Sequence, residues 1–476
     1  MAVRTVSNTG GNWNATTAWV GGVVPIANDT VDFTALSGNL TVNVTTATLA
    51  GINFTNYVGT ITFNANISVN TSVNLGTGGY TQAGGGTFGL AIGNTTTITS
   101  NGVSWNNSLS FTGNGVTYTL ADNLNVTGNI VLAGTSSITF TGNILYIGGN
   151  LTVSSTATAL GTTTFNFNGT GTWSYPSVGL IRNNITINTL GTLTISGNIY
   201  YNTGTLTYIA GTVVSTGSVL NIALATTFNT SGMTWRDISI TAGTQTLISD
   251  LNSEVLRMAN TSTVNVDTSG GNVYILESLI KSGTGISQGT ASINLIGTGT
   301  WTHTAAGVIR NNININTTGT LTIGTNVYYG VGTLKYFSGK INAKNSTFNI
   351  SASATLINCH KINFHNIRVN QSSIVTMNEF FSGSPSLVTN ITSNGTNYTI
   401  AFQDGFEKIA KFVNISGCTL TRPLQLLVLT KSKRNSTNIG IRYINQSPNG
   451  IAKGDPSIQN QTTFGAGGLL ADPTNL

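Results

Sequence analysis

The chain has 476 residues, of which 57 are glycine, 7 are proline and 7% are charged, against about 25% charged residues in an average soluble protein. A coiled coil needs charged flanking positions and a polyelectrolyte chain needs many charges, so both classes are excluded. Because Thr, Asn, Gly and Val are poor helix formers, a helical enzyme is also disfavoured. What remains is an all-β protein with a neutral polar surface.

Residues 1–34 are predicted to form an N-terminal cap or anchor. Trp13 and Trp19 flank a short polar stretch. Two large aromatic side chains can cover the open end of a stack of apolar residues, which would otherwise be left exposed. No run of 18 apolar residues follows here or later in the chain, so no membrane insertion is expected.

Residues 35–375 show a hydrophobic pattern of period two. In 40–44 and 60–63, for example, apolar residues alternate with Thr or Asn, which predicts strands with one apolar face. Evenly spaced short strands suit either stacked β-sandwiches or a β-solenoid. A long internal duplication with no linker favours the solenoid, and we predict a parallel β-helix. Crossover chirality predicts that it is right-handed.

The duplication joins residues 169–213 to 297–341 at an offset of 128. It predicts modules at about 95–225 and 226–345, followed by a partial copy at 346–375. The matched residues are Trp173 with Trp301, Arg182 with Arg310, Asn183 with Asn311, Tyr200 with Tyr328 and Tyr201 with Tyr329.

Residues 376–447 depart from the repeat and are predicted to form a C-terminal β domain that caps the solenoid. The apolar runs 424–430 and 439–444 bracket the polar tip 431–438, a pattern typical of a hairpin with a charged loop. Residues 448–476 are expected to form an extended tail, either packed on a neighbouring subunit or frayed.

Charge is concentrated in the last part of the chain. From residue 335 to the C-terminus, 13 basic and 5 acidic residues give a local net charge of +8, and the whole chain carries +6. This excess suits a nucleic-acid or membrane surface. No aromatic residues alternate with the basic ones as a base-stacking groove requires. We therefore expect ordinary solvation of a differently folded section and no nucleic-acid partner.

The duplicated Tyr200-Tyr201 and Tyr328-Tyr329 pairs are candidate glycan-stacking residues. Neighbours in a strand point to opposite faces, so one tyrosine of each pair is expected to face outward. The repeated Arg182-Asn183 and Arg310-Asn311 are candidates for a ligand-binding site, because the planar donors of a guanidinium match the two oxygens of a carboxylate. The favoured alternative is an internal turn in which Asn side chains form hydrogen bonds to neighbouring coils and the Arg side chains cap carbonyl oxygens.

Catalysis needs a pair of carboxylates if the substrate is a polysaccharide. The candidates are Asp267 with Glu277, and Glu379 with Asp404 and Glu407, but none lies in a duplicated or recognisable motif. No catalytic residue is therefore predicted. His303, His360 and His365 lack metal-ligand spacing, and Cys359 and Cys418 supply no metal site. We expect no metal and no cofactor.

The opening of the chain carries a family resemblance. The order Gly11, Trp13, Trp19, Gly21, Gly22, Pro25, Asp29, Val31 resembles the start of repetitive bacterial surface adhesins and of bacteriophage structural proteins. The first residues lack a charged stretch, an apolar core and a cleavage site, so no export signal is expected. Because such adhesins normally carry one, the resemblance to phage fibre and spike proteins is favoured.

The resemblance implies a homotrimer, assembled in the host cytoplasm and exposed on the virion. Capsid, tail or baseplate proteins would be its partners, and a host surface glycan is a further candidate. The expected function is that of a non-enzymatic virion protein: a tail or head fibre, spike or decoration protein. The alternatives are a polysaccharide-degrading tailspike and a bacterial surface adhesin.

Overall fold

The computed structural model describes residues 2–403 except 85, 155, 157, 177, 371, 382–388 and 394–397, and further on 408–411, 413–416, 418–420, 427–430, 441–444, 446–447 and 450–451. Strands account for 55% of the structure and helices for 2%, and the strands stack in parallel as a β-solenoid. The predicted fold class is thereby confirmed. The chain divides into two compact units, residues 1–236 and 237–476.

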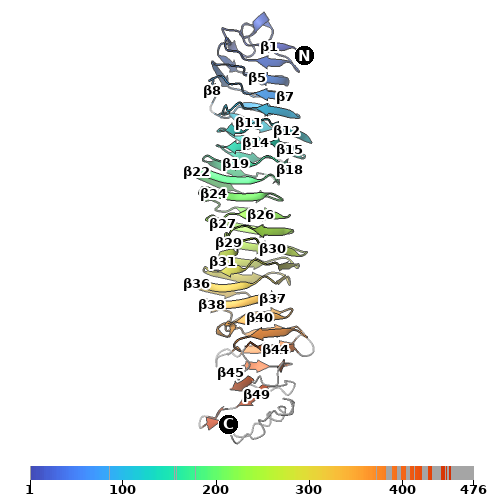
Figure 1. Cartoon of the computed structure of the whole chain (residues 1–476), viewed down its shortest axis with the longest axis vertical. Coiled ribbons are helices and arrows are strands. Elements are labelled where there is room, and N and C mark those ends of the chain that lie inside the picture. Colours follow the sequence, from blue (N-terminus) through green and yellow to red (C-terminus); the bar gives the residue numbers. More distant parts are fainter. Residues whose placement is uncertain are drawn as a thin grey trace. The chain divides into compact units, whose positions relative to one another are not determined.

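Unit 1 is built from coils in which each strand pairs with the equivalent strand of the next coil, as the stacked arrows of Figure 1 show. Its short 3-10 helices are η1 (Thr16–Ala18) and η2 (Val20–Gly22). Its strands are β1 (Val3–Thr5), β2 (Gly11–Asn12), β3 (Thr30–Asp32), β4 (Leu40–Val42), β5 (Leu49–Asn53), β6 (Thr60–Phe63), β7 (Ile67–Asn74), β8 (Thr81–Ala83), β9 (Gly89–Ile92), β10 (Thr96–Thr99), β11 (Ser108–Phe111), β12 (Val116–Leu120), β13 (Leu124–Val126), β14 (Ile130–Leu132), β15 (Ile138–Gly142), β16 (Leu145–Ile147), β17 (Leu151–Val153), β18 (Thr158–Gly161), β19 (Phe165–Phe167), β20 (Gly171–Ser174), β21 (Leu180–Ile181), β22 (Ile185–Ser196), β23 (Asn198–Tyr200), β24 (Thr205–Val214), β25 (Val219–Ile222) and β26 (Thr226–Asn229).

The period-two pattern explains why these segments form strands. In β12, Val116, Tyr118 and Leu120 are buried and the threonines between them are partly exposed. Parallel pairing sets Val116 beside Ile138 and Tyr118 beside Phe140 of β15. Because paired strands lie about 4.8 Å apart, apolar side chains stack on apolar side chains from coil to coil. This stack is the core of the unit.

Unit 2 repeats the same construction. The boundary between the units, after residue 236, falls within strand β27 (Thr234–Ile240). Unit 2 also contains one short 3-10 helix among its described residues, η3 (Cys359–Lys361). The remaining strands are β28 (Thr244–Leu247), β29 (Leu251–Met258), β30 (Val264–Thr268), β31 (Val273–Lys281), β32 (Ile286–Gln288), β33 (Ile293–Leu295), β34 (Gly299–His303), β35 (Val308–Ile309), β36 (Ile313–Ile323), β37 (Asn326–Tyr329), β38 (Thr333–Asn342), β39 (Thr347–Ile350), β40 (Ala354–Ile357), β41 (Asn366–Val369), β42 (Ile374–Met377), β43 (Thr389–Ser393), β44 (Tyr398–Phe402), β45 (Lys408–Lys411), β46 (Val413–Ile415), β47 (Cys418–Leu420), β48 (Leu427–Thr430), β49 (Ile441–Ile444), β50 (Gln446–Ser447) and β51 (Gly450–Ile451).

The C-terminal strands correct one sequence prediction. β48 pairs with β49 in parallel, and β45 pairs with β48 in the same sense. The antiparallel hairpin predicted from 424–430 and 439–444 is therefore wrong, because parallel neighbours need a full crossover between them. The predicted tip 431–438 lies outside the described residues, and so does the tail 448–476 apart from β51.

Candidate functional site

The two predicted cap tryptophans lie in the first coil of unit 1. Both are 2% exposed, and their ring centroids are 4.9 Å apart in an edge-to-face arrangement. Trp19 Nε1 donates a hydrogen bond to the carbonyl oxygen of Trp13 at 2.8 Å. Nearby, Arg4 Nε lies 2.8 Å from Asp29 Oδ2. This hydrogen bond, with others from backbone amides, lowers the pKa of Asp29 to about 2. The segment is thus held by both apolar and charged contacts.

The duplicated segments have the same backbone geometry in both units. Trp173 and Trp301 are fully buried, in β20 and β34. β22 pairs with β24, and β36 pairs with β38, with two register shifts at equivalent positions. Both pairs can be followed in Figure 1. The duplication in the sequence is therefore also a duplication of bulges and buried rings.

The repeated asparagines join neighbouring coils. Asn183 and Asn311 are fully buried, and the Nδ2 of each donates to a carbonyl oxygen, that of Thr163 at 3.0 Å and that of Ala291 at 3.1 Å. Arg182 is exposed and Arg310 is half-buried. The observed hydrogen bonds are those of the favoured internal turn, and the asparagines are not available to an external ligand.

The tyrosine pairs divide as strand alternation predicts. Tyr201 and Tyr329 are 0% exposed, whereas Tyr200 and Tyr328 are half-buried. Tyr201 and Tyr329 must therefore be removed from the predicted glycan-stacking residues, because a surface ligand cannot reach them. The spacing Ile199-x-Tyr201 in the sequence gives the same inward phase and could have identified the buried member.

The outward faces of β24 and β38 were not singled out from the sequence. Each contains a bulge closed by a tyrosine hydroxyl, which donates to the carbonyl oxygen of Gly211 or Gly339 at 2.7 Å. These glycines have φ of 112° and 109°, values that favour glycine. The tyrosines are Tyr208 and Tyr336. The repeated spacing Tyr-x-x-Gly was the available sequence signal.

At the bulge, one large apolar residue of each copy faces solvent. Ile209 is 59% exposed in unit 1, and Phe337 is 49% exposed in unit 2. Lys335 Nζ lies 4.4 Å from the Phe337 ring centroid. Lys361 Nζ, on η3, lies 6.0 Å from the centroid of Tyr336. We call Lys335, Phe337, Lys340, Lys344 and Lys361 the basic ridge.

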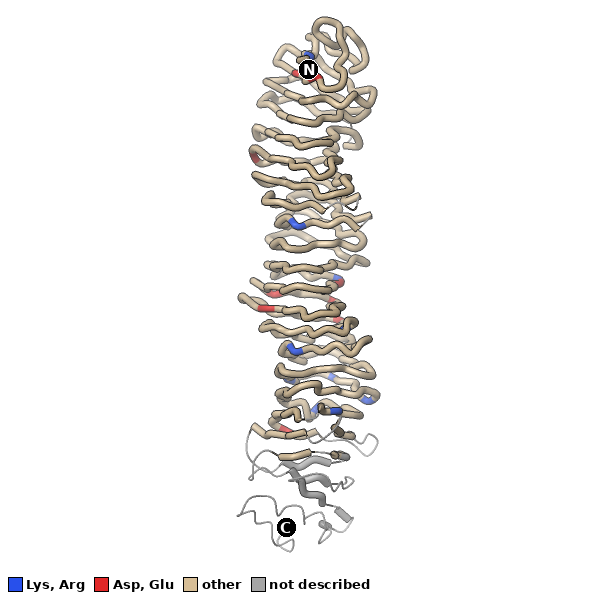
Figure 2. The backbone as a smooth tube through the Cα atoms, turned by 90° about the vertical axis from the view of Figure 1, so that its right-hand side faces the viewer, with Lys and Arg blue, Asp and Glu red and all other residues tan. Residues whose placement is uncertain are grey.

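The basic ridge has no charged counterpart in the first copy. At the 128-residue offset, Lys335, Lys340 and Lys344 replace three threonines, namely Thr207, Thr212 and Thr216. Lys340, Lys344 and Lys361 are exposed, and Lys335 is half-buried. Figure 2 shows the same contrast, with few charged residues along unit 1 and more along unit 2.

Inside unit 2, the structure buries a polar cluster that the sequence analysis missed. Lys281 is 0% exposed, and its Nζ donates to Asn260 Oδ1 at 2.7 Å and to the carbonyl oxygen of Met258 at 3.4 Å. Ser287 Oγ also donates to Asn260 Oδ1, at 3.1 Å. Burial lowers the pKa of Lys281 to about 8. The amine is thus hydrogen-bonded but poorly solvated.

His303 lies in the coil next to Lys281 and is paired with it in register. Its Nδ1 is 3.0 Å from the carbonyl oxygen of Gly307, and its Nε2 accepts from Trp301 Nε1 at 3.1 Å. Burial lowers the pKa of His303 to about 3, so the ring is neutral at pH 7. Both ring nitrogens are engaged within the protein.

The candidate carboxylates do not form a described pair. Asp267 lies in β30 and Glu277 in β31, and these strands belong to different sheets. Asp267 Oδ1 accepts from the Thr290 amide at 3.0 Å. Glu379 is exposed, and its predicted partners Asp404 and Glu407 lie outside the described residues. Among the described residues, no group of three His, Cys, Asp or Glu side chains is placed to hold a metal ion.

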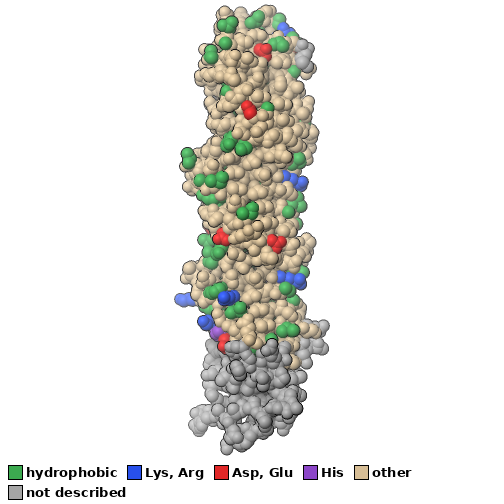
Figure 3. Space-filling model, viewed as in Figure 1, with side chains coloured by type: hydrophobic (Ala, Val, Ile, Leu, Met, Phe, Trp, Pro, Cys, Tyr) green, Lys and Arg blue, Asp and Glu red, His purple; other side chains and the backbone are tan. Residues whose placement is uncertain are grey.

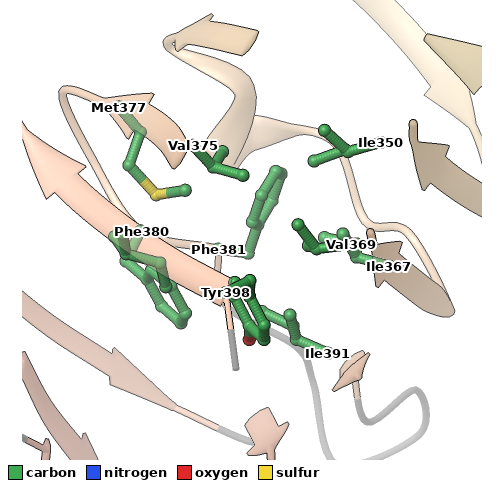
Figure 4. Close-up of a pocket in the computed structure, with 10 residues that line it drawn as sticks. Ile350, Ile367, Val369, Val375, Met377, Phe380, Phe381, Ile391 and Tyr398 are labelled. Carbon is green, nitrogen blue, oxygen red and sulfur yellow. The ribbon is translucent and has the colours of Figure 1, made fainter. Parts of the chain in front are cut away.

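Two cavities among the described residues are too small to act as ligand sites. One in unit 2 has a volume of about 10 Å³, which is room for one water at most. Its apolar lining includes Met377, Phe380 and Phe381, whose side chains converge in Figure 4. A second cavity, in unit 1 beside Trp105, has the same volume. Both are packing gaps within the core.

The described part of the chain also contains no helix of the length and hydrophobicity needed to cross a membrane. Both cysteines are buried and neither forms a disulfide, and burial raises the pKa of the Cys359 thiol to about 12. Comparison of the chain with protein-family models, with curated proteins and with solved structures finds no match in any of the three.

Proposed function

We propose that the chain is a non-enzymatic structural protein of a bacteriophage virion, a fibre, spike or decoration protein that displays a host-contacting surface. The observation that carries this proposal is the contrast between the two copies. The buried Trp173/Trp301 and Tyr201/Tyr329 rings and the bulges are retained, while outward residues of β24 and β38 differ. That is the pattern of a scaffold whose purpose is to present surface residues.

The packing of the interior supports a scaffold over an enzyme. Large aromatic rings fill the coils from Trp13 to Tyr398, and the two cavities found among the described residues have almost no free volume. Enzyme and ligand pockets commonly enclose several hundred Å³. On the visible face, hydrophobic side chains are scattered and do not gather into one patch (Figure 3). A polysaccharide-degrading tailspike would require the Asp267–Glu277 or Glu379 carboxylates to work on an open surface.

A bacterial surface adhesin would display residues in the same way, and oligomeric state separates it from the fibre. The test is light scattering after size-exclusion chromatography of the recombinant full chain, with negative-stain images of the same peak. A homotrimer is expected. A monomer would overturn the trimeric fibre and favour the adhesin. Release of new reducing ends from polysaccharides incubated with the chain would overturn the non-enzymatic assignment.

A further inference from the structure

We propose that the basic ridge of unit 2 binds an anionic polysaccharide. This inference rests on the proposed function, because it names the class of surface molecule that the displayed face contacts. It is carried by the charge of the coils around β38, by the exposed Phe337 ring and by the neutral equivalent in the first copy.

Two groups of coils within unit 2 differ in the sign of their charge. Residues 335–368 contain five basic residues and no acidic one, whereas residues 237–281 contain five acidic and two basic residues. None of the ridge lysines forms an ion pair with another described residue. Their charges are therefore available to a ligand. A surface of one charge sign attracts and retains a polyanion by raising its local concentration.

The ridge combines cations with an aromatic face, which corrects the sequence-based expectation that no aromatic residues lie among the basic ones. Lys335 and Lys361 lie against Phe337 and Tyr336, at 4.4 and 6.0 Å from their ring centroids. Phe337 is half exposed at the outward position that follows the buried Tyr336, where β38 bulges. An exposed ring offers an apolar surface for the C–H face of a sugar, while the ammonium groups bind its carboxylate, sulfate or phosphate. Cations and ring together match a charged sugar.

The density of charge favours a polysaccharide over a nucleic acid. Duplex DNA carries one charge per about 1.7 Å, and its binding proteins present correspondingly dense basic surfaces. Here four lysines are spread over the coils formed by β38, the turn after it and η3. An acidic polysaccharide, with one charge on each sugar or every second sugar, has a spacing closer to that of such a surface.

The first copy provides a control within the same chain. The bulge and its tyrosine hydrogen bond are the same in β24, but Thr207, Thr212 and Thr216 stand at the lysine positions. The triple variant K335T/K340T/K344T therefore introduces residues that this backbone already accommodates. The reverse variant T207K/T212K/T216K transfers the charges to unit 1.

The experiment measures binding of the full chain to polygalacturonate, with neutral dextran and duplex DNA as comparison probes. We expect polygalacturonate to bind, dextran not to bind, and the affinity to fall as salt rises. The triple threonine variant should bind at least tenfold more weakly with an unchanged melting temperature. The reverse variant should bind more polygalacturonate per chain, a gain that damage to the fold cannot produce.

Three outcomes would overturn this inference. They are absence of polygalacturonate binding at low salt, an unchanged affinity in the triple threonine variant, and tighter binding of DNA than of polygalacturonate. Each would leave the proposed structural role intact if the chain is a homotrimer. A monomeric chain that binds polygalacturonate through the basic ridge would overturn the proposed trimeric fibre and support the proposed polysaccharide site.

Discussion

The copy of the duplicated segment in unit 1 and the copy in unit 2 share a backbone but differ in chemistry. Inside the coils, Val153, Ala159 and Tyr175 of the first copy correspond at the 128-residue offset to three polar residues of the second. Those residues are Lys281, Ser287 and His303. The same ladder therefore accommodates either an apolar or a polar interior, provided that the polar groups are hydrogen-bonded.

Outside the coils, the two copies differ at positions whose side chains do not contribute to strand pairing. The outward positions of β24 and β38 contribute little to the core, so they can change from threonine to lysine without altering the strand pairing. The buried ring, the bulge glycine and the tyrosine hydroxyl are retained in both copies. Substitutions at these shared positions, and at Lys281, test how far the two copies are energetically equivalent.

The largest effect is expected at the buried tryptophans. Trp173→Ala and Trp301→Ala should each lower the free energy of unfolding by about 3–5 kcal/mol, because a large cavity replaces a fully buried ring. Urea unfolding of each variant gives the measurement. Leu190→Ala, at a fully exposed position of β22, is the control and should change stability by less than about 0.5 kcal/mol. A loss confined to one tryptophan would show that the copies are not equivalent.

The bulge glycines should come next. In Gly211→Ala and Gly339→Ala, the new methyl group would meet the carbonyl oxygen of Thr189 at 2.7 Å or of Thr317 at 2.6 Å. With the unfavourable positive φ, each substitution should lower the free energy of unfolding by about 1–3 kcal/mol. Gly217→Ala has a positive φ but nothing within 4 Å, so thermal unfolding should show a smaller loss. Equal losses at all three glycines would contradict the steric explanation.

Lys281→Met tests the interior difference between the copies. The variant removes a poorly solvated amine, so the free energy of unfolding at pH 7 should rise by about 1–2 kcal/mol. The pKa of Lys281 is about 8 in the folded protein and near 10.5 in a solvated chain. Between these values the unfolded chain binds more protons, so this group makes stability rise with pH.

The measurement is the difference in unfolding free energy between Lys281→Met and the wild type, taken from pH 7 to pH 10.5. The advantage of the variant should shrink above pH 8, where the folded wild type loses the buried proton. Taking the difference removes the opposite contribution of Cys359, whose pKa is raised. A difference that stays constant over this range would argue against a strongly lowered lysine pKa.

The smallest effect is expected at the bulge tyrosines. Tyr208→Phe and Tyr336→Phe each remove a 2.7 Å hydrogen bond to a glycine carbonyl oxygen and should lower the free energy of unfolding by about 0.5–1.5 kcal/mol. Differential scanning calorimetry of both variants is the check. Because Tyr336 also lies beneath Lys361, a larger loss at Tyr336 would assign part of the difference to that contact.

Most of the fold follows from the alternation and the duplication in the sequence, because a parallel solenoid places like residues on like residues. The hairpin prediction was wrong because a parallel solenoid also places two successive apolar runs side by side. Two apolar runs around a polar tip look alike whether the second run returns beside the first or one coil later, as β49 does beside β48. Local pattern alone does not distinguish the two.

The site was less predictable. Leu279-Ile-Lys281 gives Lys281 the same inward phase as Leu279, but a charged residue is not expected inside the coils, and hydrogen bonds from Nζ to Met258 and Asn260 accommodate it. In the basic ridge, Lys335 and Phe337 keep the outward phase of β38, and the bulge then changes the alternation so that Ser338 is exposed as well. Neither hydrogen-bond partners nor bulges are visible in hydrophobic periodicity.

The register of the ladders also has a consequence for how each unit is made. Thr30 pairs with Gly51 and Ile138 pairs with Ala159, so each of these partners lies 21 residues further along the chain. A newly synthesised coil therefore finds its template in the segment that left the ribosome just before it. Within a unit, folding can advance coil by coil during translation, without waiting for distant parts of the chain.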